Sequence, residues 1–172
     1  MADNQAILKT LIQGATVELF QSYGIAVAPT LQNQPLPKTV DDYVGGYGAF
    51  TGGGLNGTLG LLVPKPVFSL ASLEGPRIIN ILDWTKELTN QLFGRIKSRL
   101  AYYQMLLRGD IPSALEGKSL EMRVAASSPF MTVHFRSIRG EVIVTVAGTI
   151  DYSKFQFSSL IHMAEAGDII MF

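Results

Sequence analysis

Apolar residues recur at intervals of three and four in two long segments of the chain, a spacing typical of amphipathic helices. The first segment, residues 4–23, is followed by Gly24, which predicts the end of an N-terminal helix. The second predicts a long helix from Arg77 to about Leu107, with Pro76 before it and Pro112 beyond it. Its predicted apolar side comprises Ile78, Leu82, Leu92, Phe93, Ile96, Leu100 and Tyr103.

Strand-like patterns fill most of the remaining chain, apart from a short helix predicted over residues 66–74. Strands are predicted over residues 43–50, 55–63, 120–126, 131–138 and 141–151, with the first two forming a hairpin and the last three a meander. Helices and strands are segregated, which predicts an α+β fold whose largely antiparallel sheet packs against the long helix and the N-terminal helix. No linker divides the chain, so residues 1–172 are predicted to form a single domain. The pattern is ambiguous over residues 153–172.

The composition limits the classes of function. The chain has 14 acidic and 14 basic residues and a formal net charge of zero, which argues against a general binder of nucleic acids or anionic membranes. It has no cysteine, so disulfides, thiolate nucleophiles and cysteine-ligated zinc are excluded. It shows neither a signal peptide nor an apolar run of the roughly 18 residues that span a membrane. We therefore expect a cytoplasmic protein that neither binds nucleic acid nor inserts into membranes.

Few residues offer chemistry of their own. His134 lies within a predicted strand, where a structural role is favoured, and His162 lacks the neighbours of a catalytic triad. Asp110 is assigned to the turn that ends the long helix. The segment TGGGLNG lacks the lysine of a phosphate-binding loop, and no helix follows it in frame, so a hairpin turn is favoured.

One side of the long helix carries polar residues in register. Asp83, Glu87 and Asn90 follow one another at spacings of four and three, Gly94 lies one turn further on, and Lys97 lies at the edge of this side. Asn and Gly both weaken a helix, so stability does not explain why they occur here.

Two interpretations of this stripe are open. It is either a solvated helix face that contains an asparagine by chance, or a site that acts on another protein. A carboxamide donates and accepts hydrogen bonds and can hold a water molecule, and a carboxylate one turn away can pair with a partner's cation. Gly94 and Ala101 would keep this surface low enough for a second protein to approach. Asp83 and Glu87 without a histidine are weak evidence for a metal site, so no metal is assigned.

The stripe resembles the signature of the CheC/CheX/FliY class of chemotaxis phosphatases. That signature is an Asp or Ser, three residues, Glu, two residues, Asn and, after a spacer, a proline. Asp83, Glu87 and Asn90 match it, Gly94 matches a frequent glycine, and Pro112 follows after 21 intervening residues, one fewer than usual. The segments YGIAVAP, FTGGGLNGTLGLLVP and IPSALEGKSLEMR also resemble this family, so the resemblance covers about residues 5–152. The CheX branch, with its single signature, matches best.

The resemblance implies hydrolysis of the aspartyl phosphate on a CheY-like response regulator. In that family the asparagine orients the attacking water and the glutamate contacts a lysine of the regulator. Carried onto this chain, Asn90 would orient the water and Glu87 would dock to the lysine. Asp83, Gly94 and Lys97 would support the contact with the partner. Mg²⁺ would belong to the regulator, so the chain would need no cofactor of its own, and homodimers are expected because CheX-type relatives form them.

Alternatives to this activity are kept open. The main one is a non-catalytic module on the same fold that docks a response regulator or a flagellar or signalling component. A stand-alone enzyme for small molecules is disfavoured, because no nucleophile–base pair is evident. Trp84 lies about 60° from Glu87 around the helix, where it either lines the docking surface or packs beneath a neighbour.

Overall fold

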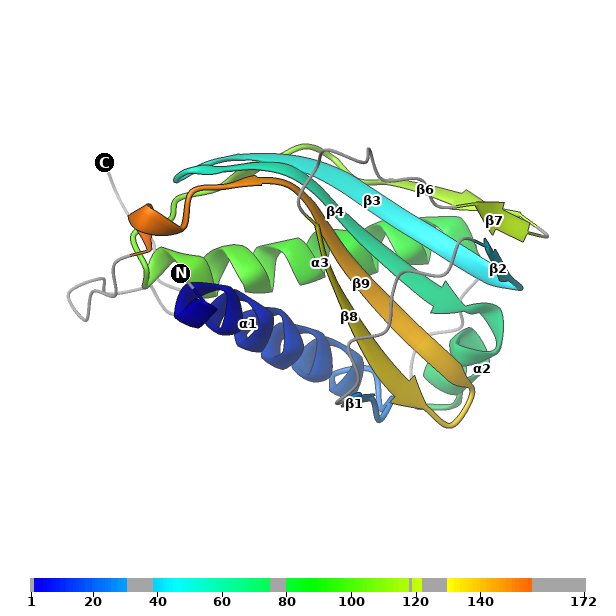
Figure 1. Ribbon diagram of the computed structural model, residues 1–172. Helices are drawn as coiled ribbons and strands as arrows, with labels where there is room; N and C mark the ends of the chain where they lie inside the picture. Colours follow the sequence, from blue (N-terminus) through cyan, green and yellow to red (C-terminus); the bar gives the residue numbers. More distant parts are fainter. Residues whose placement is uncertain (1, 31–38, 75–79, 118, 122–129, 156–172) are drawn as a thin grey trace, which may run out of the picture.

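The computed structural model describes residues 2–30, 39–74, 80–117, 119–121 and 130–155. A curved antiparallel sheet carries helices α1 (Ala2–Gln21) and α3 (Ile81–Ala101) on one face (Figure 1). The strand order is β1-β8-β9-β4-β3-β5, and β6 also pairs with β3. The strands are β1 (Ala28–Pro29), β3 (Tyr43–Gly52), β4 (Leu55–Pro64), β5 (Arg108–Gly109), β6 (Ser113–Glu116), β8 (Phe130–Ser137) and β9 (Gly140–Ile150). The predicted α+β fold, with a sheet packed against both helices, is confirmed.

Four further elements complete the described structure. They are a two-stranded sheet of β2 (Thr39–Asp41) and β7 (Ser119–Glu121), helix α2 (Lys65–Glu74) and a 3₁₀ turn η1 (Tyr152–Lys154). The prediction of a three-stranded meander is wrong, because β7 pairs with β2 rather than with β8. Leu120 of β7 is buried with Leu62 and Ile143, which stabilises β7 against the main sheet. Residues 122–129 and the predicted tail beyond residue 155 lie outside the described residues.

The core lies between the sheet and the two helices. Side chains alternate between the two faces of each strand, so every second residue of β4 and β9 points toward the helices. These residues are Leu59, Leu61, Val63, Val142, Val144 and Val146, and they join Leu8, Ile12 and Leu19 of α1 and Leu88, Leu92 and Ile96 of α3 in one buried cluster. Among the described residues, no helix is both long and apolar enough to cross a membrane.

Helix α3 packs closely on β3 through small residues. A Cβ added at Gly46 would overlap the Thr89 hydroxyl and crowd Thr85, so glycine is required for this approach. Both threonines are fully buried, and their hydroxyls donate to carbonyls four residues earlier, Thr85 to Ile81 at 2.7 Å and Thr89 to Thr85 at 2.8 Å. The sheet therefore fixes one side of α3 and leaves the opposite side exposed.

Helix α3 ends six residues before the predicted end. The chain reverses at Gln104, which has a φ of 59°, and the Met105 N–H donates to the Leu100 carbonyl at 3.1 Å. Met105 and Leu107 are thereby buried in the core, and Arg108 and Gly109 form β5 instead of a helix terminus. The helical periodicity of the sequence continues through this reversal, so the pattern could not reveal it.

Trp84 holds α3 against its neighbouring helices. Its ring lies 5.5 Å from the ring of Tyr23, just after α1, and 4.6 Å from the ring of Phe68 on α2, in edge-on contacts. It is partly buried against the core. Of the two interpretations of Trp84, packing beneath its neighbours is the one that the structure supports.

Candidate functional site

The polar stripe begins at a well-capped helix end. Asn80 precedes α3, and its side-chain oxygen accepts from the N–H groups of Leu82 at 2.9 Å and Asp83 at 3.2 Å. The Asp83 carboxylate lies in the first turn, where the helix dipole favours negative charge, and pairs with Lys86 at 3.4 Å. Asp83 thus has a structural role at the start of the helix, and it faces solvent.

Glu87 is held by a hydrogen bond along the helix. Its Oε1 accepts from Gln91 Nε2 at 2.8 Å, and Gln91 Oε1 in turn accepts from the Tyr23 hydroxyl at 3.3 Å. These contacts restrict the Glu87 carboxylate while leaving it exposed. Sequence reasoning did not single out Gln91. The only feature of the sequence that could have indicated a role for Gln91 is its position one turn after Glu87.

Asn90 is exposed on the same side of α3, and its carboxamide has no hydrogen-bond partner among the described residues. The neighbouring Thr89 is fully buried, so the helix backbone beneath Asn90 is fixed by the contact with β3. Asn90 therefore presents an unpaired donor and acceptor group from a rigid support, which is an arrangement suited to binding water or a partner.

A second wall faces this stripe from the segment between β5 and β6. Gly109 pairs with Phe50 of β3, and a Cβ at Gly109 would overlap the ring of Phe93, one turn beyond Asn90. The Asp110 N–H donates to the Ala49 carbonyl at 2.9 Å, and Ser113 pairs with Tyr47 where β6 begins. The residues 110–112 are thus anchored to β3 at both ends. We call them the lip.

Helix and lip enclose an open hollow of about 300 Å³. It is lined by Asp83, Lys86, Glu87, Asn90, Gly109, Asp110, Ile111 and Pro112. Pro112, the distant member of the sequence pattern, thus lines the same hollow as Glu87 and Asn90. Asp110 and Ile111 were missed as site residues, because their place opposite the helix depends on the reversal at Gln104. Among the described residues, no group of three carboxylates or histidines could hold a metal ion.

The other predicted residues of the stripe lie outside this hollow. Gly94 is exposed and lines a second hollow of about 470 Å³ on the side of α1, next to Gln91. Lys97 is exposed and lines neither hollow. Ala101 is buried in the packing of α3, so the prediction that it lowers the exposed surface is wrong.

The second hollow is formed by residues that join α1 to α3. Glu18 of α1 pairs with Arg99 at 2.5 Å and with Arg95 at 3.8 Å, and Arg99 also donates to the Leu11 carbonyl at 3.1 Å. Both arginines thus share the single Glu18 carboxylate, which balances only one of their two positive charges. The contacts of Glu18 and Arg99 stabilise the packing of α1 against α3.

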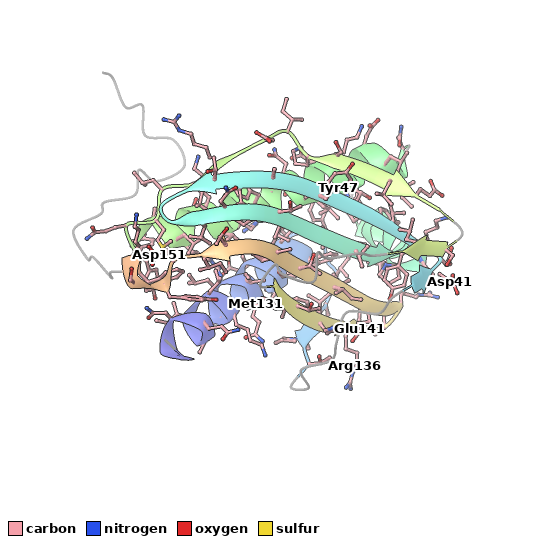
Figure 2. All side chains as sticks on the ribbon, turned by 45° about the horizontal axis from the view of Figure 1, so that its top comes forward. Asp41, Tyr47, Met131, Arg136, Glu141 and Asp151 are labelled. Atoms are coloured by element: carbon pink, nitrogen blue, oxygen red, sulfur yellow. The ribbon has the colours of Figure 1, made fainter. Side chains whose placement is uncertain are left out.

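His134 lies within β8, a strand of the main sheet, and is buried. Its Nδ1 lies 3.2 Å from Glu141 Oε2, and the Tyr43 hydroxyl donates to the Glu141 carbonyl at 2.8 Å. Burial and the Glu141 carboxylate raise the pKa of Tyr43. Figure 2 shows Glu141 on β9 and Tyr47 on β3, viewed from the face of the sheet that turns away from the helices. None of the residues around His134 lines the hollow beside α3.

Comparison with known proteins gives a consistent result. Residues 44–136 match the family model described as "Chemotaxis phosphatase CheX". This range includes the hairpin of β3 and β4 except Tyr43, the whole of α3 and the lip. No curated protein sequence is significantly similar to the chain.

Several solved structures share the fold. The chemotaxis protein CheX from Desulfovibrio desulfuricans is similar with a TM-score of 0.70 and 22% identity, covering 81% of this chain and 97% of that one. A CheC-like superfamily protein from Shewanella sp. PV-4 has a TM-score of 0.71 and 16% identity, covering 81% and 96%. CheX in the CheX–CheY–BeF3–Mg complex from Borrelia burgdorferi has a TM-score of 0.54 and 15% identity, covering 83% and 97%.

Proposed function

Because this chain belongs to the CheX family of chemotaxis phosphatases, we propose that it hydrolyses the aspartyl phosphate of a CheY-like response regulator. The water attacks phosphorus, the bond from phosphorus to the aspartyl oxygen breaks, and inorganic phosphate leaves with the free carboxylate as the second product. Such a transfer depends mainly on positioning and on neutralising charge. The chain need supply no nucleophile.

The exposed carboxamide of Asn90 is the observation that carries this proposal. It projects from a fixed helix into an open hollow and has no hydrogen-bond partner among the described residues. In the proposed complex it enters the regulator's active site, accepts a hydrogen bond from the water and holds the water in line with phosphorus. The Mg²⁺ of the reaction belongs to the regulator. A solved complex of CheX with CheY, BeF3 and Mg²⁺ supports a partner of this kind.

Glu87 is proposed to dock to the lysine of the regulator's active site. Its bond to Gln91 limits the orientations of the carboxylate before the partner arrives, which lowers the entropy cost of docking. Asp83 supports the start of α3, and Gly94 and Lys97 are proposed to lie on the outer part of the contact surface, away from the hollow. We also propose that the chain acts in the cytoplasm, together with the regulator.

A homodimer is part of the proposal. Tyr47 of β3 and Leu115 of β6 lie on the face of the sheet away from α3, and both are exposed. Two apolar side chains on neighbouring strands support self-association, although by themselves they form a small patch. The molar mass in solution, measured by light scattering on a sizing column, tests this part separately from catalysis.

The decisive experiment compares Asn90→Ala with the wild-type chain. CheY-like regulators from the same genome are phosphorylated with a small phosphodonor in Mg²⁺, and phosphate release is followed with and without the chain. We expect Asn90→Ala to lower the accelerated rate about 10²-fold or more, because it removes a group that acts at the reacting atoms. Alanine is a better helix former than asparagine, so the fold should be retained.

Asn56→Ala is the matched control, since Asn56 is an exposed asparagine of β4 outside the hollow. It should release phosphate at the wild-type rate. If Asn90→Ala also kept the wild-type rate, the role of Asn90 would be rejected. If the wild-type chain bound a regulator without accelerating any, the chain would be a non-catalytic docking module.

A further inference from the structure

Ile111 is the most exposed large apolar residue described in the chain, at 93% of its full surface. Burying an isoleucine removes apolar surface from water and contributes about 1.5–3 kcal/mol to a fold. In this chain Ile111 makes almost no such contribution. Single exposed apolar residues are common on protein surfaces, so exposure alone has no functional meaning. The position and the rigidity of Ile111 distinguish it from other exposed apolar residues.

Ile111 occupies the middle of the lip that forms one wall of the Glu87 and Asn90 hollow. The lip is fixed at both ends, by the bond from Asp110 to Ala49 and by the pairing of Ser113 with Tyr47. Any protein that buries Asn90 in its own active site must therefore also meet Ile111. The two residues belong to one surface.

The conformation of Ile111 is restricted before any partner arrives. Pro112 follows it, and a proline confines the backbone of the preceding residue to extended conformations. Its β-branched side chain has few rotamers. An apolar side chain with so little freedom loses little entropy on binding, which is the property of an effective anchor. Interfaces concentrate their binding energy in a few such anchors surrounded by polar residues.

The charges around Ile111 indicate what kind of surface it meets. Asp83, Glu87 and Asp110 line the hollow with only Lys86 opposing them, so the rim is acidic. A symmetric contact between two copies of this chain through the hollow would bring carboxylates against carboxylates, which is unfavourable. The partner must instead offer a cation to the hollow and an apolar patch to the lip.

The geometry points to Ile111 as a specificity-determining anchor that docks on an apolar patch beside the lysine of the phosphorylated receiver domain, an inference that rests on the proposed function. Glu87 and Asn90 then contact the regulator from the α3 wall of the hollow, and Ile111 contacts it from the lip. Regulators that carry an apolar residue at that place are substrates, and regulators with a charged residue there are discriminated against. Asn90 supplies the chemistry, and Ile111 contributes to the choice of partner.

The test separates affinity from turnover. The regulator that the wild-type chain binds most tightly is loaded with BeF3 and Mg²⁺, and its dissociation constant is measured for wild type, Ile111→Ser and Ile111→Val. Phosphate release from the phosphorylated regulator then gives kcat and KM. We expect Ile111→Ser to raise the dissociation constant and KM about tenfold, because most of the buried apolar group is lost, while kcat is unchanged. Ile111→Val should stay within about fourfold of wild type, since one methylene is removed.

Ile138→Ser is the matched control. Ile138 is 82% exposed in the turn between β8 and β9 and does not line the hollow, so this change should leave both constants unaltered. The inference is overturned if Ile111→Ser binds like wild type, if its kcat falls as much as its affinity, or if it changes the molar mass and so reveals contact between copies. Failure of the proposed function looks different: phosphate release would not respond to Asn90→Ala, whereas the dissociation constants would still report on Ile111.

Discussion

At the residue scale, Glu87 and Asn90 differ in how the chain prepares them. The Glu87 carboxylate is oriented by Gln91, whereas the Asn90 carboxamide has no hydrogen-bond partner among the described residues. A docking group benefits from being oriented in advance, because less freedom is lost on binding. The Asn90 carboxamide, which must hold a water against phosphorus, instead gains its hydrogen-bond partners only when the regulator binds. The different surroundings of the two side chains thus suit the two proposed roles.

The hydrogen bond between Gln91 and Glu87 leads to a test of this difference. Gln91→Ala frees the carboxylate, and we expect kcat/KM to fall between about twofold and tenfold, because a hydrogen bond contributes about 0.5–1.5 kcal/mol. Gln91→Glu should cost more, since it adds a like charge one turn from Glu87. Steady-state phosphate release measures both effects.

Gln5→Ala serves as the control for the Gln91 variants, since Gln5 is an exposed glutamine of α1. A purely structural role for Gln91 would lower the thermal midpoint of both Gln91 variants and leave kcat/KM of the folded chain intact. Equal activity of Gln91→Ala and Gln91→Glu would likewise contradict a role in orienting the carboxylate.

Sequence reasoning could find Glu87 and Asn90 because both lie on one helix, where spacing alone determines which residues share a side. It could not find Asp110 or Ile111, which reach the hollow only through the pairing of β5 and β6 with β3. Ala101 was misplaced for a related reason. Its angular position on the helix is on the polar side, but as the last residue of α3 it is buried. The catalytic roles of Glu87 and Asn90 stay predictions until they are tested.

At the element scale, α3 is the support on which the site depends. The overlap that a Cβ at Gly46 would create with Thr89 shows how near the helix lies to β3, and a similar contact joins Gly109 to Phe93. The long helix and the two hairpins were predictable from periodicity. The end of α3 was not, because it depends on a left-handed residue, Gln104, that is not a glycine.

Gly94 allows the stability of α3 to be separated from docking. A Cβ added there would meet no atom within 4 Å, so Gly94→Ala should raise the free energy of unfolding by up to about 1 kcal/mol through helix propensity. If a regulator approaches this side of α3 closely, the added methyl group should lower kcat/KM severalfold at the same time. Chemical denaturation and phosphate release on the same sample measure both quantities.

Ser98→Ala is the comparison for Gly94→Ala, because Ser98 is an exposed residue one turn further along α3 and the change adds no bulk. It should leave kcat/KM unchanged. A Gly94→Ala chain that is more stable and fully active would show that the contact surface does not extend to Gly94, and would restrict it to the hollow and the lip.

At the scale of the whole molecule, the charge is balanced but unevenly distributed. The chain has a formal net charge of zero, yet three carboxylates and one ammonium group line the hollow. The net charge of the sequence could not reveal this local excess of negative charge, because the residues involved come from two separate segments. A neutral molecule exerts little long-range attraction, so electrostatic attraction of a regulator must arise from the hollow itself.

This local field predicts how activity depends on salt. Raising the ionic strength from ~0.1 M to ~1 M shortens the Debye length from about 10 Å to about 3 Å, so kcat/KM should fall severalfold while kcat changes little.

Glu87→Gln removes one charge from the hollow and should reduce both kcat/KM and its salt dependence. Asp41→Asn alters the net charge equally, but Asp41 (labelled in Figure 2) lies on β2 and does not line the hollow, so this variant should keep the wild-type salt dependence. Initial rates of phosphate release, corrected at each salt concentration for the regulator alone, provide the measurement. Equal salt dependence in both variants would show that the overall charge, and not the acidic rim beside Asn90, attracts the partner.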